Sequence, residues 1–119
     1  MNTFTIKAIR LLSGNELYIN GQKLDSAETA RMMQCPDTGF HWGTDGPEAD
    51  LSAAAICFYY LGDFYGGVEL IELSKRFKAE FVKNWAPDQD IDVDIDMHAH
   101  YRDYINHFWD SALQERYDF

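Results

Sequence analysis

The stretch Asp88-Gln89-Asp90-Ile91-Asp92-Val93-Asp94-Ile95-Asp96-Met97-His98-Ala99-His100-Tyr101 decides the fold of this chain. Aspartates and then histidines occupy every even position from 88 to 100, and apolar residues fill the odd positions from 91 to 101. Such alternation is typical of a β-strand with one face packed on a core and the other in water. The sequence therefore predicts a half-buried strand across residues 88–101.

The solvent-exposed face of this predicted strand carries five carboxylates in a row. Aspartate is depleted in strands, and like charges on one face repel each other, so the charge must have a use. It can protect an exposed strand edge from pairing with another sheet, or it can bind a cationic partner. Alternate strand residues stand about 6.5–7 Å apart, close to the advance of two nucleotides along one DNA strand. Both alternatives stay open for Asp88, Asp90, Asp92, Asp94 and Asp96.

A divalent-metal module, or a metal-dependent enzyme, is a further alternative for the end of this stretch. On a strand, His98 and His100 would share a face with Asp94 and Asp96, and imidazole and carboxylate are ligands of Zn²⁺. If a helix begins at Met97 instead, the two imidazoles diverge by about 200° and the site is lost. A calcium loop of the EF-hand type is excluded, because no register supplies both its glycine and its final glutamate.

Length and composition predict one folded domain over residues 1–119. With 46% hydrophobic and 15% aromatic residues, the chain can bury a core and is not of the disordered class. The net charge of −10 argues against direct nucleic-acid binding, which needs Lys and Arg, but it attracts basic proteins. Cys35 and Cys57 form no paired motif, which favours a reduced, cytoplasmic protein without a cofactor. We expect no membrane segment, since the apolar run 51–61 is about half the length that a bilayer needs.

Around the acidic stretch, the patterns predict an α+β domain, in which a short antiparallel sheet packs on three to four helices. β-Branched residues over 3–12 indicate a first strand. Asn20-Gly21 between two short runs indicates a hairpin over residues 16–24, because this pair supplies the positive φ angles of a tight turn.

Four helices are predicted from capping signals and apolar spacing. Asp25 with Glu28 fits a capped helix over 26–34, and Gly46-Pro47 fits the start of a central helix that ends at Leu61. An apolar stripe from Leu70 to Trp85 predicts the next helix, which begins after Gly66-Gly67 and ends before Pro87. The aromatic spacing of residues 101–113 predicts a closing helix.

The turn between the first and second of these helices carries two aromatic residues, Phe40 and Trp42. A helix start after such a turn can hold a phosphate, but the acidic residues that crowd it would repel an anion. We therefore interpret Phe40 and Trp42 as anchors of a turn that aims the central helix. His41 and His107 are isolated in the sequence, and we expect them to be structural or exposed.

The stretch Gly39-Phe40-His41-Trp42-Gly43-Thr44-Asp45-Gly46-Pro47, the Ala-rich helix that follows Leu51, and Phe77-Lys78 with Val82 resemble a small family. It is a numbered family of unknown function found in bacteria, archaea and their phages, and the resemblance covers about residues 17–109. This chain has Thr44 where the family usually has Tyr, and its turn before Pro47 is shorter. The resemblance implies a shared fold unit and a phage or mobile-element origin, and it implies no activity.

We find no catalytic motif: the serines lie in no nucleophile elbow, and neither a P-loop nor a dinucleotide fingerprint occurs. We therefore expect a small, acidic, non-enzymatic binding protein, and the concrete version is a phage-encoded inhibitor of a basic host defence protein, such as an anti-CRISPR protein. An aromatic cluster stands at the end of the central helix and consists of Tyr59, Tyr60, Phe64 and Tyr65. It would serve core packing or a homo-oligomer, or its tyrosines Tyr59, Tyr60 and Tyr65 would add apolar anchoring to the partner.

Overall fold

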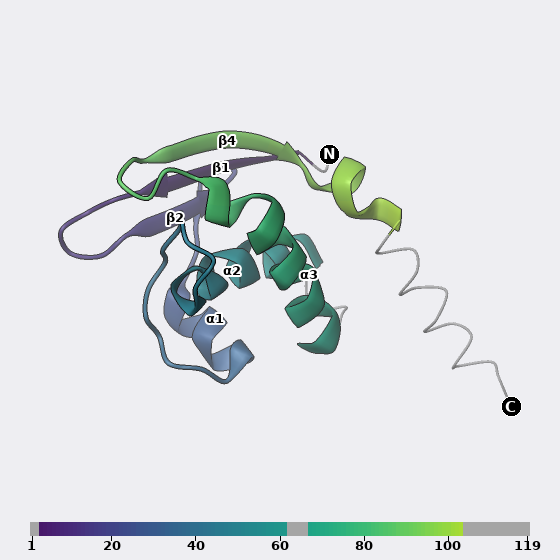
Figure 1. Ribbon diagram of the computed structural model, residues 1–119, viewed down its shortest axis with the longest axis horizontal. Helices are drawn as coiled ribbons and strands as arrows, with labels where there is room; N and C mark the ends of the chain where they lie inside the picture. The colour runs from purple at the N-terminus through teal and green to yellow at the C-terminus, as the bar shows by residue number, and fades with distance from the viewer. Residues whose placement is uncertain (1–2, 62–66, 104–119) are drawn as a thin grey trace, which may run out of the picture.

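The computed structural model describes residues 3–61 and 67–103. In this part of the chain, a four-stranded antiparallel sheet packs on a layer of helices (Figure 1). The strands are β1 (Thr3–Ile9), β2 (Glu16–Ile19), β3 (Gln22–Lys23) and β4 (Ile91–Asp96). The helices are α1 (Ser26–Met33), α2 (Asp50–Leu61) and α3 (Gly67–Glu80), with the 3₁₀ turns η1 (Pro47–Ala49) and η3 (Val82–Asn84), and residues 97–103 are helical as well.

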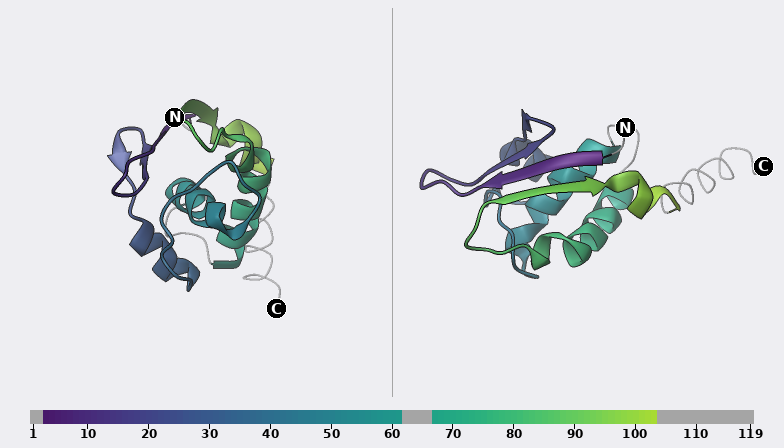
Figure 2. Two further views of the ribbon diagram at one scale, coloured as in Figure 1. Left: turned by 60° about the vertical axis from the view of Figure 1, so that its left-hand side comes forward. Right: turned by 90° about the horizontal axis from the view of Figure 1, so that it is seen from above.

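The strand order β3-β2-β1-β4 places β1 inside the sheet and β4 at one end of it. β1 pairs with β2 on one side and with β4 on the other, both antiparallel. Helices α1, α2 and α3 lie against one face of the sheet, as Figure 1 and the two views of Figure 2 show. Phe4, Ile6 and Ala8 of β1 point into this layer together with Ile91 and Ile95 of β4. The prediction of an α+β fold is thus confirmed.

Two local predictions near the N-terminus are confirmed in detail. Asn20 and Gly21 join β2 to β3 with φ angles of 51° and 82°, as the tight turn requires. Asp25 caps α1, because its carboxylate accepts the backbone N–H of Ala27 at 2.9 Å. α1 then ends at Met33, where the next residue adopts the left-handed conformation.

Two predicted elements end earlier than expected. The first strand stops at Ile9 instead of residue 12, because the chain turns where Gly14 donates its N–H to the carbonyl of Leu11. The helix predicted to reach Trp85 stops at Glu80, and a 3₁₀ turn follows. The side-chain amide of Asn84 donates to the Glu80 carbonyl at 3.3 Å, which satisfies one of the last carbonyls of α3.

The central helix α2 is buried on nearly all sides, as its apolar composition predicts. Ser52 is the buried polar residue of this helix, and its hydroxyl donates to the His41 carbonyl at 2.7 Å. Cys57 is fully buried, and burial raises the pKa of its thiol, whereas Cys35 is exposed. Cys57 is therefore a small buried residue of the core.

The loop before α2 is fixed to the segment that leads into β4. The indole N–H of Trp42 donates to the carbonyls of Ala86 and Gln89 at 3.0 and 3.1 Å. Gly43 has a φ of 80°, and a Cβ there would lie 2.6 Å from both the side chain of Pro87 and a backbone oxygen. Only glycine fits this approach, so the architectural interpretation of the Trp42 turn holds.

Replacement of Gly43 tests this contact. We expect Gly43→Ala to lower the free energy of unfolding by about 3 kcal/mol, because it adds a backbone clash to an unfavourable φ. Gly21→Ala is the matched control, since Gly21 has a similar φ of 82° with nothing within 4 Å. We expect the control to cost about 1 kcal/mol in urea unfolding. Equal losses of unfolding free energy in the two variants would show that the close contact with Pro87 does not affect stability.

Candidate functional site

The acidic strand is shorter than the sequence predicts. β4 covers residues 91–96, so Asp92, Asp94 and Asp96 stand on the strand, whereas Asp88 and Asp90 precede it. All five aspartates are exposed. Because the apolar residues of β4 face the helices, the three strand aspartates lie on the uncovered face of the sheet. We call Asp92, Asp94 and Asp96 the carboxylate edge.

Asp88 and Asp90 have a structural role that the sequence did not reveal. The backbone N–H of Arg10 donates to a carboxylate oxygen of Asp90 at 2.8 Å. The guanidinium of the same arginine donates to the Asp88 carbonyl at 2.6 Å. Arg10 follows directly after β1, so these bonds tie the end of β1 to the loop that enters β4. The prediction that both residues continue the strand is wrong.

Asp96 ends the strand and caps the helical segment that follows. Its carboxylate accepts the backbone N–H of Ala99 at 3.0 Å, which is the N-cap bond of a helix that begins at residue 97. Met97 and Tyr101 are both buried. Their spacing of four residues fits a helix as well as a strand, which is why the alternation to residue 101 was misleading.

Tyr101 holds this helical segment on α3. Its hydroxyl donates to a carboxylate oxygen of Glu80 at 3.1 Å, and the Arg76 guanidinium lies 5.5 Å from the centre of its ring. Burial, together with the nearby Glu80 carboxylate, raises the pKa of the Tyr101 phenol. Tyr101 therefore stays neutral under all ordinary conditions and acts as a fixed donor.

The register of β1 and β4 determines what faces the carboxylate edge within the sheet. Lys7 stands opposite Asp92, and two threonines stand opposite Asp94 and Asp96. Within residues 3–61 and 70–103, no lysine or arginine forms an ion pair with any residue of the carboxylate edge. No ion pair within the described part of the chain therefore neutralises these carboxylates, and Lys7 is the basic residue that the register places across from one of them.

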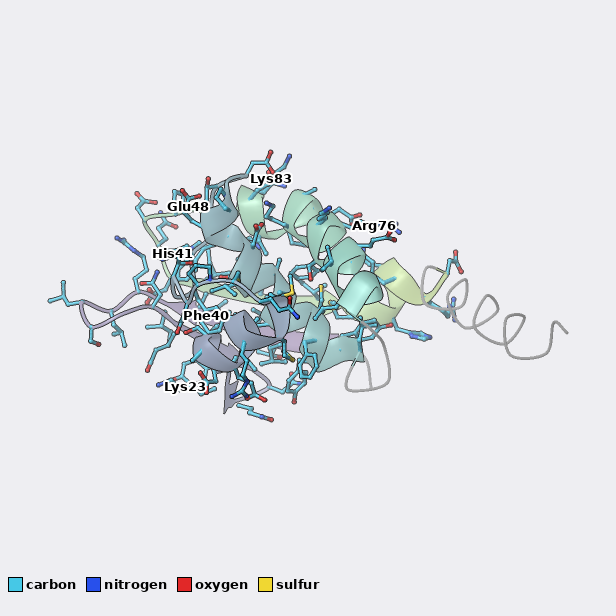
Figure 3. All side chains as sticks on the ribbon, turned by 90° about the horizontal axis from the view of Figure 1, so that it is seen from below. Lys23, Phe40, His41, Glu48, Arg76 and Lys83 are labelled. Carbon is cyan, nitrogen blue, oxygen red and sulfur yellow. The ribbon has the colours of Figure 1, made fainter. Side chains whose placement is uncertain are left out.

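Much of the basic charge lies on the helical side. Figure 3 shows this side, with Arg76 and Lys83 along α3 and η3. Arg76 pairs with Glu80 at 3.1 Å, and Lys78 pairs with Asp50 at 2.6 Å. The sheet thus separates these cations from the carboxylate edge, whereas Lys7 of β1 shares the open face with it.

The metal alternative loses the geometry on which it depended. Residues 97–103 are helical, so His98 and His100 point about 200° apart and do not share a face with the strand aspartates. The His100 ring packs 5.1 Å from that of Phe81, and His98 lies 3.4 Å from the Tyr60 hydroxyl. The described residues contain no group of three His, Cys, Asp or Glu side chains that converge on one point.

The two described aromatics of the predicted anchor are partly engaged in packing. Tyr59 and Tyr60 are half-buried and contact the Phe4 ring edge-on, with centroids 5.3 and 6.0 Å away. Such contacts stabilise the end of α2 against β1. Phe64 and Tyr65 lie outside the described residues, as does His107.

An open hollow of about 680 Å³ lies beside β2, β3 and the start of α1, but its charged side chains already have partners. Glu16 binds Lys23 at 2.8 Å and accepts the Tyr18 hydroxyl at 2.9 Å. These bonds lower the pKa of Glu16 and raise the pKa values of Lys23 and Tyr18. Asp25 caps α1, and Asp37 accepts the N–H of Gly39. The hollow thus offers structural contacts and no catalytic pair.

The capping role of Asp96 can be separated from its charge. We expect Asp96→Ala to lower the free energy of unfolding by about 1 kcal/mol, because the N-cap acceptor is lost. Asp96→Asn keeps an acceptor and should stay within a few tenths of a kcal/mol of the wild type. Urea unfolding of both variants measures the difference, and an equal effect would contradict the capping bond.

The raised pKa of Tyr101 predicts a loss of stability at alkaline pH. Above pH 10 the phenol ionises in the unfolded chain but not in the folded one, so unfolding becomes more favourable as the pH rises. We expect Tyr101→Phe to cost about 1 kcal/mol at pH 7, through the lost bond to Glu80, and to show a shallower decline above pH 10. Urea unfolding at pH 7 and pH 10.5 tests this, and parallel declines would contradict it.

Comparison with known proteins places the chain in a family without assigning a function. No curated protein and no solved structure matches it. Within the described residues, no helix combines the length and the apolar character needed to cross a bilayer. The model of one family of unknown function, DUF6166, matches residues 6–105, which include every strand and helix described above except the first residues of β1. The chain therefore belongs to the DUF6166 family.

Proposed function

We propose that this protein is a non-enzymatic binding protein that uses its carboxylate edge to contact a basic surface of another protein. One observation carries the proposal. Asp92, Asp94 and Asp96 are exposed at alternate positions of an end strand, on the face that the helices leave open, without an ion pair to the described lysines and arginines. A row of exposed carboxylates of this kind is suited to contact a positively charged surface of another protein.

Electrostatics favour a basic protein as the partner. Like charges at alternate strand positions repel, and a cationic surface removes this repulsion on binding. The net charge of −10 extends the attraction beyond the contact and speeds the encounter. Nucleic acid carries the same sign of charge and is disfavoured as a direct ligand.

The concrete version of the proposal is a phage-encoded inhibitor of a host nucleic-acid-binding defence protein, of the anti-CRISPR kind. Asp92 and Asp96 are four residues apart along the strand, which corresponds to about 13–14 Å. Successive phosphates of a nucleic-acid strand advance by about 3.4 Å, so alternate strand residues match every second phosphate. A protein that binds phosphates with lysine and arginine therefore provides a suitable surface.

Protection of the sheet edge is the competing explanation for the same charges. β4 is an end strand, and charged residues on such a strand hinder pairing with other sheets. The two explanations predict different losses when the charge is removed. Loss of protection causes aggregation, whereas loss of a binding surface lowers the rate of association.

We expect the double variant Asp92→Asn/Asp94→Asn to associate at least about threefold more slowly with a purified RNA-guided nuclease at 50 mM salt. The difference should shrink at 300 mM salt, because exposed charges are then screened. Glu28→Gln/Asp45→Asn is the control, since both residues are exposed and the net charge changes by the same amount. Biolayer interferometry measures the rates, and lysozyme serves as a basic protein without a nucleic-acid function.

Each result has a definite meaning. Equal slowing by both double variants would show that only the net charge matters and would remove the assigned role of the carboxylate edge. Binding to lysozyme but not to the nuclease would overturn the concrete version. Unchanged rates combined with aggregation of the Asp92→Asn/Asp94→Asn variant, seen by light scattering, would establish edge protection instead.

A further inference from the structure

We infer that β4 takes up an extended basic segment of the partner as an additional antiparallel strand of the sheet. This inference rests on the proposed function and specifies how the partner binds. Strand addition uses main-chain hydrogen bonds for affinity and alternate side chains for specificity. It requires an end strand whose outward backbone groups are not bonded, together with side chains that select the incoming strand.

The direction of the backbone groups follows from hydrogen bonds on the other side of β1. The Asn20 N–H donates to the Thr5 carbonyl at 2.9 Å, and the Thr5 N–H donates to the Asn20 side chain at 2.9 Å. Both backbone groups of Thr5 therefore point away from β4. Because the backbone groups of successive strand residues point to opposite sides, the backbone groups of Phe4 and Ile6 point toward β4. Arg10 is an even number of residues further on, and its N–H does point this way, since it donates to Asp90.

The same alternation determines which backbone N–H and carbonyl groups of β4 point away from β1. Ile6 stands opposite Val93, and Phe4 stands opposite Ile95. In an antiparallel pair, opposite residues of this kind exchange both of their hydrogen bonds, so the backbone groups of Val93 and Ile95 point toward β1. Those of Asp92 and Asp94 must then point away from the sheet, at the end of the strand order.

These outward groups are unused in the described part of the chain. β4 pairs with β1, and no backbone or side-chain bond from residues 3–61 or 67–103 reaches the N–H or carbonyl of Asp92 or Asp94. Two consecutive hydrogen-bonding positions are therefore available for another strand. They belong to the same two residues that present exposed carboxylates.

This coincidence defines the incoming strand. Residues that bond to Asp92 and Asp94 would stand directly opposite them, with side chains on the same open face. Lysine or arginine fits both positions, and the residue between them would turn toward half-buried Val93 and should be apolar. The expected segment thus reads basic–apolar–basic.

A second copy of this chain is a poor occupant of the same edge. If β4 paired with β4 of another molecule, carboxylates would stand opposite or diagonal to carboxylates across the new pair. Like charges directly opposite each other destabilise a strand pair. The charge that hinders self-association is the charge that selects a basic strand, so we assign the edge to a partner of opposite sign.

The experiment uses the whole chain and a capped synthetic peptide, Thr-Lys-Val-Lys-Val-Lys-Thr, at 50 mM salt. Residue-resolved hydrogen exchange by NMR should show that the amides of Asp92 and Asp94 exchange at least about tenfold more slowly when the peptide is bound, because they become hydrogen-bonded. The amides of Val93 and Ile95 should be protected already in the free protein. A peptide with the same composition but without two lysines at alternate positions, Thr-Lys-Lys-Val-Val-Lys-Thr, should give no such protection.

N-methylation separates main-chain pairing from charge attraction. Methylation of the lysine amides blocks the N–H groups that would face β4, and we expect it to weaken binding about tenfold through two lost bonds. Methylation of the valine amides keeps the same charge and changes groups that face away, so binding should be retained. Asp94→Pro removes the outward N–H and should bind more weakly than Asp94→Asn, which removes the charge alone.

The possible outcomes are distinct. If both methylated peptides bind like the parent and Asp92→Asn/Asp94→Asn still weakens binding, the partner is held by charge without strand addition. The inference is then overturned, while the proposed function survives. If the double variant binds every peptide as tightly as the wild type does, both fail. Should Asp94→Pro not fold, the methylated peptides decide the question by themselves.

Discussion

The antiparallel pairing of β1 with β4 is the interaction on which the rest of the structure depends. It joins residues 3–8 to residues 91–96, near the two ends of the described chain. Every helix from α1 to η3 lies between them in sequence, so the pairing closes a long segment at a cost in chain entropy. Burial of Phe4, Ile6, Ile91 and Ile95 against the helices offsets this cost. Among residues 3–61 and 67–103, the same pairing leaves the other side of β4 without a neighbouring strand.

Two contacts on the loop before β4 support the register of that strand. The Trp42 indole holds the loop from the helical side, and Arg10 holds it from the end of β1. A slip by one residue would turn the aspartates into the core and the isoleucines into water, which no part of the fold tolerates. The tight approach of Gly43 to Pro87 belongs to the same arrangement. The loop thus determines the face on which the carboxylates stand.

Protection of this edge and the proposed recognition of a basic strand rest on the same physical property. Carboxylates at alternate positions disfavour any strand of like charge, including a second copy of the chain, and favour a strand of opposite charge. Selectivity of this kind needs a repulsive element as well as an attractive one. Because the sheet lies between the carboxylate edge and the cations of α3, those cations do not cancel the repulsion, and Lys7 of β1 stands opposite Asp92 alone. An end strand can therefore remain open without becoming a general site of aggregation.

Local rules determined much of this protein from its sequence. The Asn20-Gly21 turn, the Asp25 cap, the buried α2 and the α+β class all follow from short-range spacing and side-chain chemistry, which are visible in one dimension. Tertiary structure decided where the acidic strand ends, because periods of two and of four residues coincide between Met97 and Tyr101, and only packing on α3 selects the helix. Tertiary structure also determined that the five aspartates differ in their structural contacts. The bonds of Arg10 to the loop before β4 join residues about eighty positions apart, and the position of β4 at the end of the sheet depends on strand order, which no local pattern contains.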